Sequence, residues 1–156
     1  MFFVGVITNQ KNEQYVKREL SGIIPTDNII FINDRNITNI KNIKFEVIII
    51  DNKINNKIEL RKIIADAKII ILNTDIQMNF ETLNNLNLTI ITYGFNSKST
   101  FTVSSIEEKY IIICLQRNIY NSENIEIEPQ EFRLEIEENI EKYISIAIFI
   151  IKKIYA

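Results

Sequence analysis

The first ninety residues alternate between short apolar runs and longer polar segments. The apolar runs are continuous rather than alternating, and they cover residues 2–7, 28–32, 46–50, 68–72 and 88–92. A continuous apolar run is typical of a strand that is covered on both faces, as in a parallel sheet. Strands separated by helical segments predict βαβ units.

Three of the intervening segments carry apolar residues at helical spacing. We expect helices over Gln10–Leu20, Lys57–Ala67 and Asn79–Leu86, and ragged helical turns or a loop over residues 34–44. Ser21-Gly22 ends the first helix, and Pro25 follows it. The second helix is expected to turn an apolar face inward, made of Ile58, Leu60, Ile63, Ile64 and Ala67.

The pattern changes after Gly94. Residues 99–104 and 124–128 alternate polar with apolar side chains, and a strong strand is expected over 110–115. These short gaps predict an antiparallel meander that ends at Pro129. A single long helix is expected from Glu135 to Tyr155, because apolar residues recur there at three- and four-residue spacing.

Together these elements predict one α/β domain spanning residues 1–156. We expect a three-layer, Rossmann-like fold with a five-stranded, mainly parallel sheet. Two or three antiparallel strands extend that sheet, and a buried C-terminal helix closes it. A chain of 156 residues is long enough to bury one real core.

Composition narrows the possible partners. The net charge is −2 and the pI is about 5.3, so nothing points to binding of nucleic acid or anionic membranes. The longest apolar run, residues 144–151, is far below the roughly 20 residues that span a bilayer. No signal peptide is evident, and the lone Cys114 fits a reducing compartment, so we expect a cytoplasmic protein. Abundant Ile, Asn and Lys, whose codons are rich in A and T, indicate a bacterial genome.

The composition also argues against most enzyme chemistry. There is no His, which removes the commonest general base and metal ligand. With three glycines in the whole chain, no Gly-rich phosphate loop can be written. We therefore expect no catalytic residue, no metal site and no bound cofactor.

Polar residues follow the expected strands directly, and the carboxyl ends of parallel strands form the usual ligand-binding edge. Three of these residues are acids, namely Asp34, Asp51 and Asp75. Such a rim of carboxylates can hold Mg²⁺. The alternative function is therefore a small Mg²⁺-dependent enzyme that acts on a nucleotide or phosphorylated substrate at these acids.

Residues 68–156 resemble the central ATP-binding domain of the Mur ligases, the ATP-dependent amino-acid ligases of peptidoglycan synthesis. The stretch Ile69–Asp75, Ile-Ile-Ile-Leu-Asn-Thr-Asp, is similar to that family's strand and Asn-x-Asp-Asp loop. Thr89–Asn96 is similar to a later strand that ends in Tyr-Gly, and Asn139–Ala147 is similar to the closing, Asn-led helix. The order of strand, loop, Tyr-Gly, meander and helix carries the resemblance.

The chain departs from the family where the chemistry lies. The Mur ligases carry a Gly-Thr-Asn-Gly-Lys-Thr loop after their first central strand, and this chain has Thr8–Glu13, Thr-Asn-Gln-Lys-Asn-Glu, in that place. Without glycines the backbone cannot easily curl around a phosphate. Lys11 is not followed by Ser or Thr, and Ile76 replaces the second Asp of the Asn-x-Asp-Asp loop. The resemblance therefore implies a degenerate and truncated nucleotide-binding domain.

We expect a non-catalytic binding or interaction module, a pseudoenzyme linked to cell-wall metabolism. Its partner is expected to be another protein or a weakly bound nucleotide. If a small molecule binds, the resemblance places it at Asn73 and Asp75, and at the loop from Tyr93 to Asn96, because both loops leave the same sheet edge. Tyr93 and Phe95 flank Gly94 and either stack on a base or pack in the core.

Overall fold

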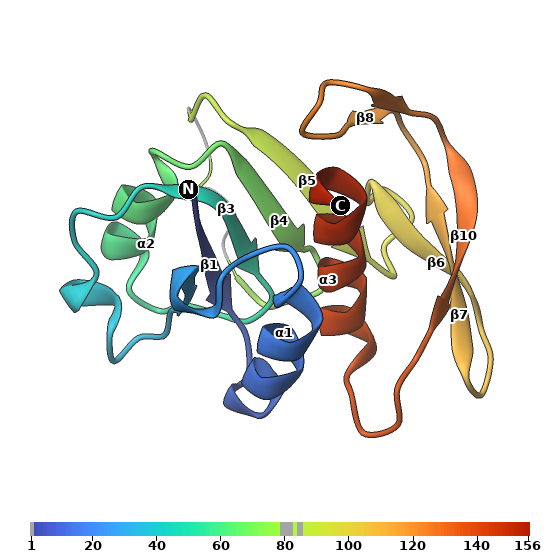
Figure 1. The fold of residues 1–156 in the computed structure, drawn as a ribbon, viewed down its shortest axis with the longest axis horizontal. Coiled ribbons are helices and arrows are strands. Elements are labelled where there is room, and N and C mark those ends of the chain that lie inside the picture. The colour runs from blue at the N-terminus through green and yellow to red at the C-terminus, as the bar shows by residue number, and fades with distance from the viewer. Residues whose placement is uncertain (1, 79–82, 84–85) are drawn as a thin grey trace.

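The computed structural model describes residues 2–78, 83 and 86–156. These residues form an eight-stranded mixed sheet with α-helices on both faces (Figure 1). The strands in spatial order are β10 (Gln130–Glu135), β7 (Tyr110–Leu115), β6 (Phe101–Ile106), β5 (Thr89–Gly94), β4 (Ile69–Asn73), β3 (Phe45–Ile50), β1 (Phe3–Ile7) and β2 (Ile29–Phe31). A small separate ribbon pairs β8 (Ile119–Tyr120) with β9 (Glu126–Ile127). The helical elements are α1 (Glu13–Leu20), α2 (Lys57–Ile64), α3 (Lys142–Tyr155) and the 3₁₀ turns η1 (Gln10–Asn12), η2 (Thr26–Asn28) and η3 (Ile37–Asn39).

The expected parallel half of the sheet is confirmed. Strands β2, β1, β3, β4 and β5 are hydrogen-bonded in parallel, each to its neighbour in that order. Their side chains alternate between two cores, as β3 shows. Its Val47 and Ile49 belong to the core under α1 and α3, whereas Ile48 packs into the core under α2.

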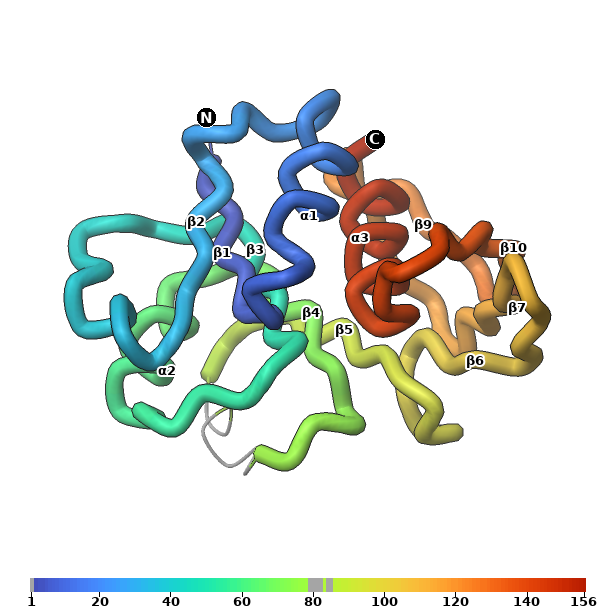
Figure 2. The backbone as a smooth tube through the Cα atoms, turned by 90° about the horizontal axis from the view of Figure 1, so that it is seen from below, coloured from blue at the N-terminus to red at the C-terminus, as the bar shows by residue number. Residues whose placement is uncertain are grey.

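The helices supply the outer layers of these two cores. Helices α1 and α3 lie side by side on one face of the sheet (Figure 2), and α2 covers the other face. Val16 and Leu20 of α1 and most of α3 are fully buried. Complete burial of one such aliphatic side chain contributes about 1.5–3 kcal/mol, so α3 is a major source of stability.

The antiparallel extension exists, but it is assembled differently from the expected meander. β6 pairs in parallel with β5, whereas β7 is antiparallel to β6 and β10 is antiparallel to β7. Pro129 does not end the extension, because β10 begins directly after it at Gln130. No crossover helix is needed between these two parallel strands, because β6 begins beside the end of β5 and continues in the same direction. Tyr93 is paired with Phe101 at this point.

The prediction of a helix beginning at Glu135 was wrong. Residues 130–135 form β10, and α3 begins only at Lys142. Phe132 and Leu134 alternate with charged residues and pack against the α3-side core, which is the two-residue period of a strand. The acids that follow resemble a helix N-terminus in sequence, but Asn139 has a left-handed backbone with φ of 68°.

Smaller differences concern α2 and the segment after β4. Ile58 was expected to face inward, yet it is 73% exposed, and α2 ends at Ile64 rather than at Ala67. The expected helix over Asn79–Leu86 lies largely outside the described residues. Among the described helices, none is long and apolar enough to cross a membrane.

Candidate functional site: the carboxyl edge of the sheet

The polar residues that follow the parallel strands gather at one edge of the sheet, around Asp51. The chain leaves β1 toward α1 on one face and leaves β3 toward α2 on the other, so β1 and β3 flank a topological switch point. Here the Thr8 hydroxyl, after β1, donates a 2.8 Å hydrogen bond to Oδ2 of Asp51, after β3. A side-chain hydrogen bond thus connects the ends of β1 and β3 across the switch point.

Asp51 receives donors from three neighbouring strands. Besides Thr8, the Tyr93 hydroxyl donates to its Oδ1 at 2.5 Å, and Asn73 Nδ2 lies 3.4 Å from the same oxygen. Asp51 is only 7% exposed. Burial raises the pKa of Asp51 to about 6, although the hydrogen bonds from Tyr93, Thr8 and Asn73 act in the opposite direction.

The four residues predicted to contact a nucleotide are brought to this edge, but at two depths. Asn73 and Tyr93 are buried and bonded to Asp51, whereas Asp75 and Asn96 are exposed. The Tyr93 ring has no exposed surface, so it packs in the core and cannot stack on a base. Asn96 Oδ1 accepts from the backbone N–H of Lys98 and orders its own loop.

The side chain of Asp75, which lies in the loop after β4, connects this loop to the loop after β5. Its Oδ2 accepts from the Phe95 N–H at 2.7 Å and from the Tyr143 hydroxyl at 2.9 Å. Partial burial and the bond to Asp75 raise the pKa of Tyr143 to about 12. Between the two loops, Gly94 has φ of 150°, and a Cβ there would lie 2.8 Å from Asp75 Oδ2. The two predicted loops therefore meet, as expected, and Gly94 permits the close approach.

A carboxylate from the start of α3 occupies the turn between β1 and α1. Glu141 accepts from Asn9 Nδ2 at 2.9 Å and from Asn12 Nδ2 at 3.4 Å, and Lys11 Nζ lies 3.2 Å away. Partial burial acts to raise the pKa of Glu141, but the bonds from Asn9 and Lys11 outweigh it and lower the value below its usual range. The side-chain donors of this turn are thus directed at the protein's own carboxylate.

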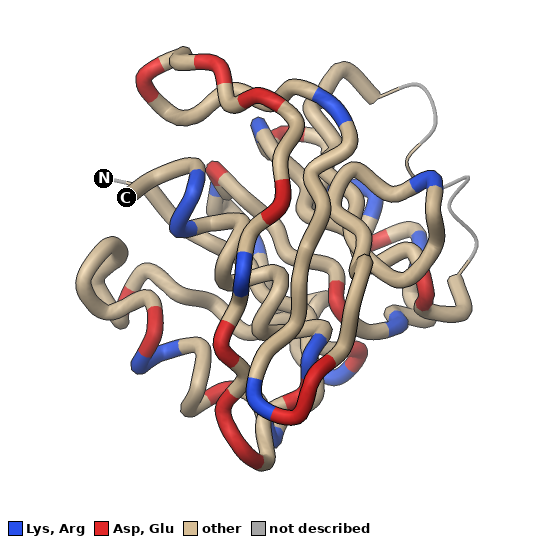
Figure 3. Tube along the Cα trace, turned by 90° about the vertical axis from the view of Figure 1, so that its right-hand side faces the viewer, with Lys and Arg blue, Asp and Glu red and all other residues tan. Residues whose placement is uncertain are grey.

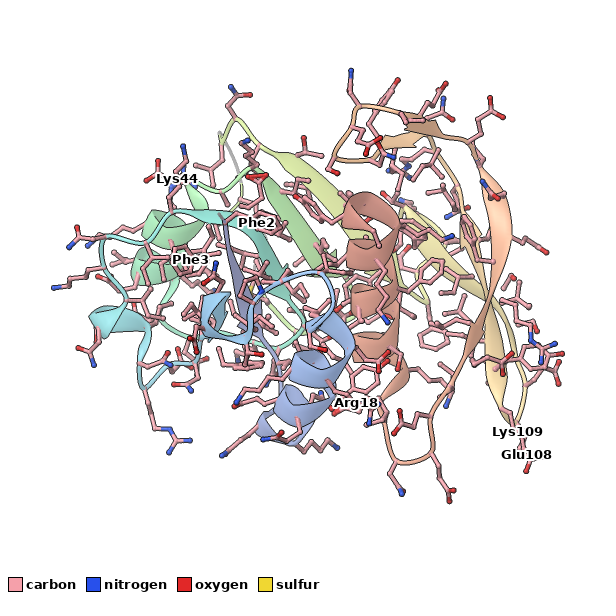
Figure 4. The ribbon with its side chains drawn as sticks, in the orientation of Figure 1. Phe2, Phe3, Arg18, Lys44, Glu108 and Lys109 are labelled. Atoms are coloured by element: carbon pink, nitrogen blue, oxygen red, sulfur yellow. The ribbon has the colours of Figure 1, made fainter. Side chains whose placement is uncertain are left out.

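A second ion pair connects α1 to the loop that precedes α3. Arg18 of α1 reaches the loop that precedes α3 (Figure 4) and forms two hydrogen bonds with the carboxylate of Glu137. The pair is exposed, so we assign it little stability by itself. Together with Glu141 it aligns the start of α3 with α1.

The three strand-end acids do not converge on a metal. Asp34 accepts from the backbone N–H groups of Asn55 and Asn56, which lead into α2, and Asp51 and Asp75 hold the bonds described above. Within the described ranges, no group of three or more acidic, Cys or His side chains could hold a metal ion. Each acid has a role in joining loops.

Open space at this edge lies beside the predicted residues rather than among them. A cleft of about 400 Å³ is lined by residues that follow β1, β2 and β3, including Asn9, Asn33 and Asn52. Asn52 Nδ2 donates to Asn9 Oδ1 at 2.9 Å across it, and Asn33 is fixed by a reciprocal bond with Asn36. Amide side chains dominate this cleft.

Sequence reasoning missed two contributors to the edge, Glu141 and Tyr143. Both come from the start of α3, which the predicted helix boundary had placed inside a longer helix. One signal was available, because Glu141 is the last acidic residue before the apolar α3 run, and it is the N-cap of the observed helix. Their contacts with Asn9 and Asp75 depend on the packing of α3 across the sheet.

Comparison with known proteins identifies the fold. No protein-family model matches the sequence, and no curated protein matches it. Among solved structures, the chain is similar to UDP-N-acetylmuramoyl-L-alanyl-D-glutamate–2,6-diaminopimelate ligase, with a TM-score of 0.70 at 11% sequence identity. The match covers 98% of this chain and 43% of that one, so the chain spans less than half the length of the ligase. At this identity the likeness concerns the fold alone, and the chain has a Mur-ligase-like α/β fold.

Proposed function

We propose that this protein is a non-catalytic binding or interaction module that retains a Mur-ligase-like fold without the family's ATP chemistry. The observation that carries the proposal is the position of Glu141. Its carboxylate lies against Lys11 and Asn9, in the turn where the resemblance would place a phosphate loop. A phosphate approaching this turn would meet a negative charge in place of free donors.

The strand-end acids support the same proposal. Phosphoryl transfer depends on positioning and on neutralising charge with backbone donors, a Lys and Mg²⁺. Here Asp51 is buried and surrounded by hydrogen-bond donors, while Asp75 binds a backbone N–H and a tyrosine. These acids connect loops through hydrogen bonds, which favours a structural role over metal-assisted catalysis.

The proposed ligand surface consists of the exposed Asp75 and Asn96, with Asn73 and Tyr93 supporting them from behind. A second protein or a weakly bound nucleotide would contact this surface. We further propose a cytoplasmic role connected with cell-wall metabolism, because the resemblance and the similar ligase both point to that chemistry.

A phosphate-release assay tests the non-catalytic assignment. Purified protein with ATP and Mg²⁺ should release phosphate no faster than a buffer control. The turn Thr8–Glu13 lacks the backbone cradle, and single charges in such sites are already worth roughly 10³–10⁵ in rate. Turnover of roughly 1 s⁻¹ or more that Asp75→Ala abolishes would contradict the proposal and support the Mg²⁺-dependent enzyme.

Thermal shift tests the ligand surface. A ligand at 100 times its dissociation constant stabilises the fold by about 2.7 kcal/mol, which raises the Tm of a chain of this size by roughly 5–10 °C. ATP, UDP-sugars and Mg²⁺ are the probes. Asp75→Ala should abolish any shift, whereas Asp66→Ala, at an exposed position in the turn after α2, should leave it unchanged. A shift that Asp75→Ala leaves intact would place the ligand elsewhere.

A further inference from the structure

Among the described residues, the sheet has an unfilled strand position next to the first half of β5, which we call the lane. β5 pairs with β4 along its whole length, from Thr89 to Tyr93, but it pairs with β6 only at Tyr93 and Gly94. Before Thr100 the chain turns away, since β6 begins at Phe101. Thr100 N–H donates to Thr92 Oγ1 at 2.8 Å, so among the described residues the lane that β6 fills further along is vacant only beside residues 89–91.

The other wall of this lane is also formed by an extended chain. β7 is antiparallel to β6, with Leu115 facing Phe101, and Gln116 N–H still bonds to Thr100 O at 2.9 Å. The chain then continues past the start of β6 into β8. Residues 117–120 thus lie across a cavity from residues 89–91.

We call this space the β5 slot and define it by residues 89–91 and 117–120. A cavity of about 340 Å³ lies between the two walls, lined by Thr89–Ile91, Thr100 and Arg117–Tyr120. At the end of the slot where β6 begins, β6 alone separates β5 from β7. The walls there stand two ladder spacings apart, which is about 9.6 Å. One extended chain therefore fits the lane.

The backbone of Ile90 points into the slot without a ladder partner. Thr89 N–H donates to Lys68 O on the β4 side, and Tyr93 O accepts from Thr74 N–H on that same side. Backbone groups in a parallel ladder alternate in direction, so Ile90 presents its N–H and C=O toward the slot. Across the part of the chain that the structure describes, no group bonds to them. An open strand edge inside a sheet is a template for strand addition.

The side chains around the slot indicate the character of the missing strand. Ile90 is 38% exposed and Tyr120 is 55% exposed, so the mouth offers apolar contact. Three exposed acids lie along the β8–β9 ribbon and directly after it, namely Glu123, Glu126 and Glu128. Figure 3 shows acidic positions along the loop at the top of the view. The one cation on this wall, Arg117, donates to Lys98 O. No acid is among the residues that line the cavity, but Glu126 accepts a hydrogen bond from Asn118 of this wall, so its charge favours basic groups at the ends of the incoming chain.

We propose that the β5 slot binds an extended peptide segment of a partner protein by strand addition, with an apolar residue at its centre and Lys or Arg at its flanks. The segment runs parallel to β5, as β6 does, and bonds to the backbone of Ile90. The slot lies at the amino end of β5, away from Asp75. The proposal therefore stands independently of the ligand surface at the carboxyl edge.

Fluorescence anisotropy with three synthetic peptides tests the proposal. The probe is labelled Lys-Thr-Val-Thr-Lys, and the controls are the same peptide with N-methyl groups on both threonines and a version with Glu in place of both Lys. We expect saturable binding of the probe and a loss of at least about tenfold on N-methylation, since one hydrogen bond is worth roughly that factor. The Glu version should also bind more weakly. No saturation at millimolar protein, or equal binding of the N-methylated peptide, would overturn the proposal.

Hydrogen exchange and two protein variants locate the bound peptide. In the free protein the Ile90 amide should exchange much faster than that of Ile91, and the probe should protect it. Ile90→Pro removes the N–H that faces the slot without removing a donor to β4, and it should abolish binding. Ile58→Ala, at an exposed position of α2, should leave binding unchanged. If Ile90→Pro does not fold, Tyr120→Ala should weaken binding instead. Unchanged binding in the folded variant, or Ile90 protection caused by self-association without peptide, would refute a partner peptide.

Discussion

The phenol of Tyr93 and the carboxylate of Asp51 meet at 2.5 Å in the interior of the protein, each at the end of a strand and separated by β4. Tyr93 has no exposed surface, and Asp51 has almost none. Burial and the nearby charge of Asp51 raise the pKa of Tyr93 well above its usual value, so the phenol remains a donor. Among the described residues, hydroxyl and amide groups bond to this carboxylate and no cation pairs with it, which makes its ionisation costly.

The first prediction concerns the pH dependence of stability. The pKa of Asp51 is about 6 in the folded protein, against 3.8 for the free side chain. As pH rises from about 4 to 6, the unfolded chain loses this proton before the folded one does. The free energy of unfolding should therefore fall by about 3 kcal/mol from this group alone.

Urea unfolding of wild type and Asp51→Asn between pH 4 and 7.5 checks this slope. The variant should lack the fall, so its stability relative to wild type should increase with pH. Asp66→Asn, at an exposed acid on the other face, is the matched control and should follow the wild-type curve. Parallel curves for wild type and Asp51→Asn would show that Asp51 does not titrate in this range.

A second prediction concerns the donor itself. Tyr93→Phe removes the hydroxyl but preserves the buried ring, and it leaves Asp51 Oδ1 with the longer bond from Asn73 only. We expect a loss of about 1–3 kcal/mol at pH 7, since a buried acceptor loses its partner. The loss should shrink near pH 4, where Asp51 is protonated. A loss that is independent of pH would indicate that the hydroxyl does not act through Asp51.

A third prediction uses two glycines. Gly94→Ala places a Cβ 2.8 Å from Asp75 Oδ2 and 2.9 Å from Thr74 Oγ1, at a φ of 150° that side chains rarely adopt. We expect a loss of at least about 2 kcal/mol, because overpacking and backbone strain add. Gly22→Ala is the control, since nothing lies within 4 Å of its Cβ position. Equal denaturation midpoints for the two variants would contradict the close approach at Gly94.

A fourth prediction concerns Glu141 at the β1–α1 turn. Glu141→Gln removes the charge that faces Lys11 but retains an oxygen for Asn9, so stability should fall by only about 0.5–1 kcal/mol. The difference should diminish at 1 M salt, which screens the pair. Glu138→Gln, in the same loop, should be neutral at both salt concentrations. A large loss that persists at 1 M salt would indicate that Glu141 acts through geometry rather than charge.

The parallel half of the fold could be derived from the sequence because its signal is local. Continuous apolar runs such as residues 46–50 specify strands that are buried on both faces, and the period of α1 specifies a one-sided helix. The meeting of Asp75 with the loop at Gly94 also followed, since parallel strands bring their carboxyl ends to one edge. These features depend on period and polarity, which any stretch of the chain carries within itself.

Long-range pairing decided the remainder. Whether residues 130–135 form a strand or the start of a helix depends on the open edge of β7, and the acids beyond them are compatible with either. The bonds from Asn9 to Glu141 and from Tyr143 to Asp75 exist because α3 packs across the sheet, bringing residues more than sixty positions apart into contact. The vacant lane beside Ile90 arises from where β6 starts relative to β5. Register of this kind is set by the packing of the whole sheet, so no local pattern in the chain encodes it.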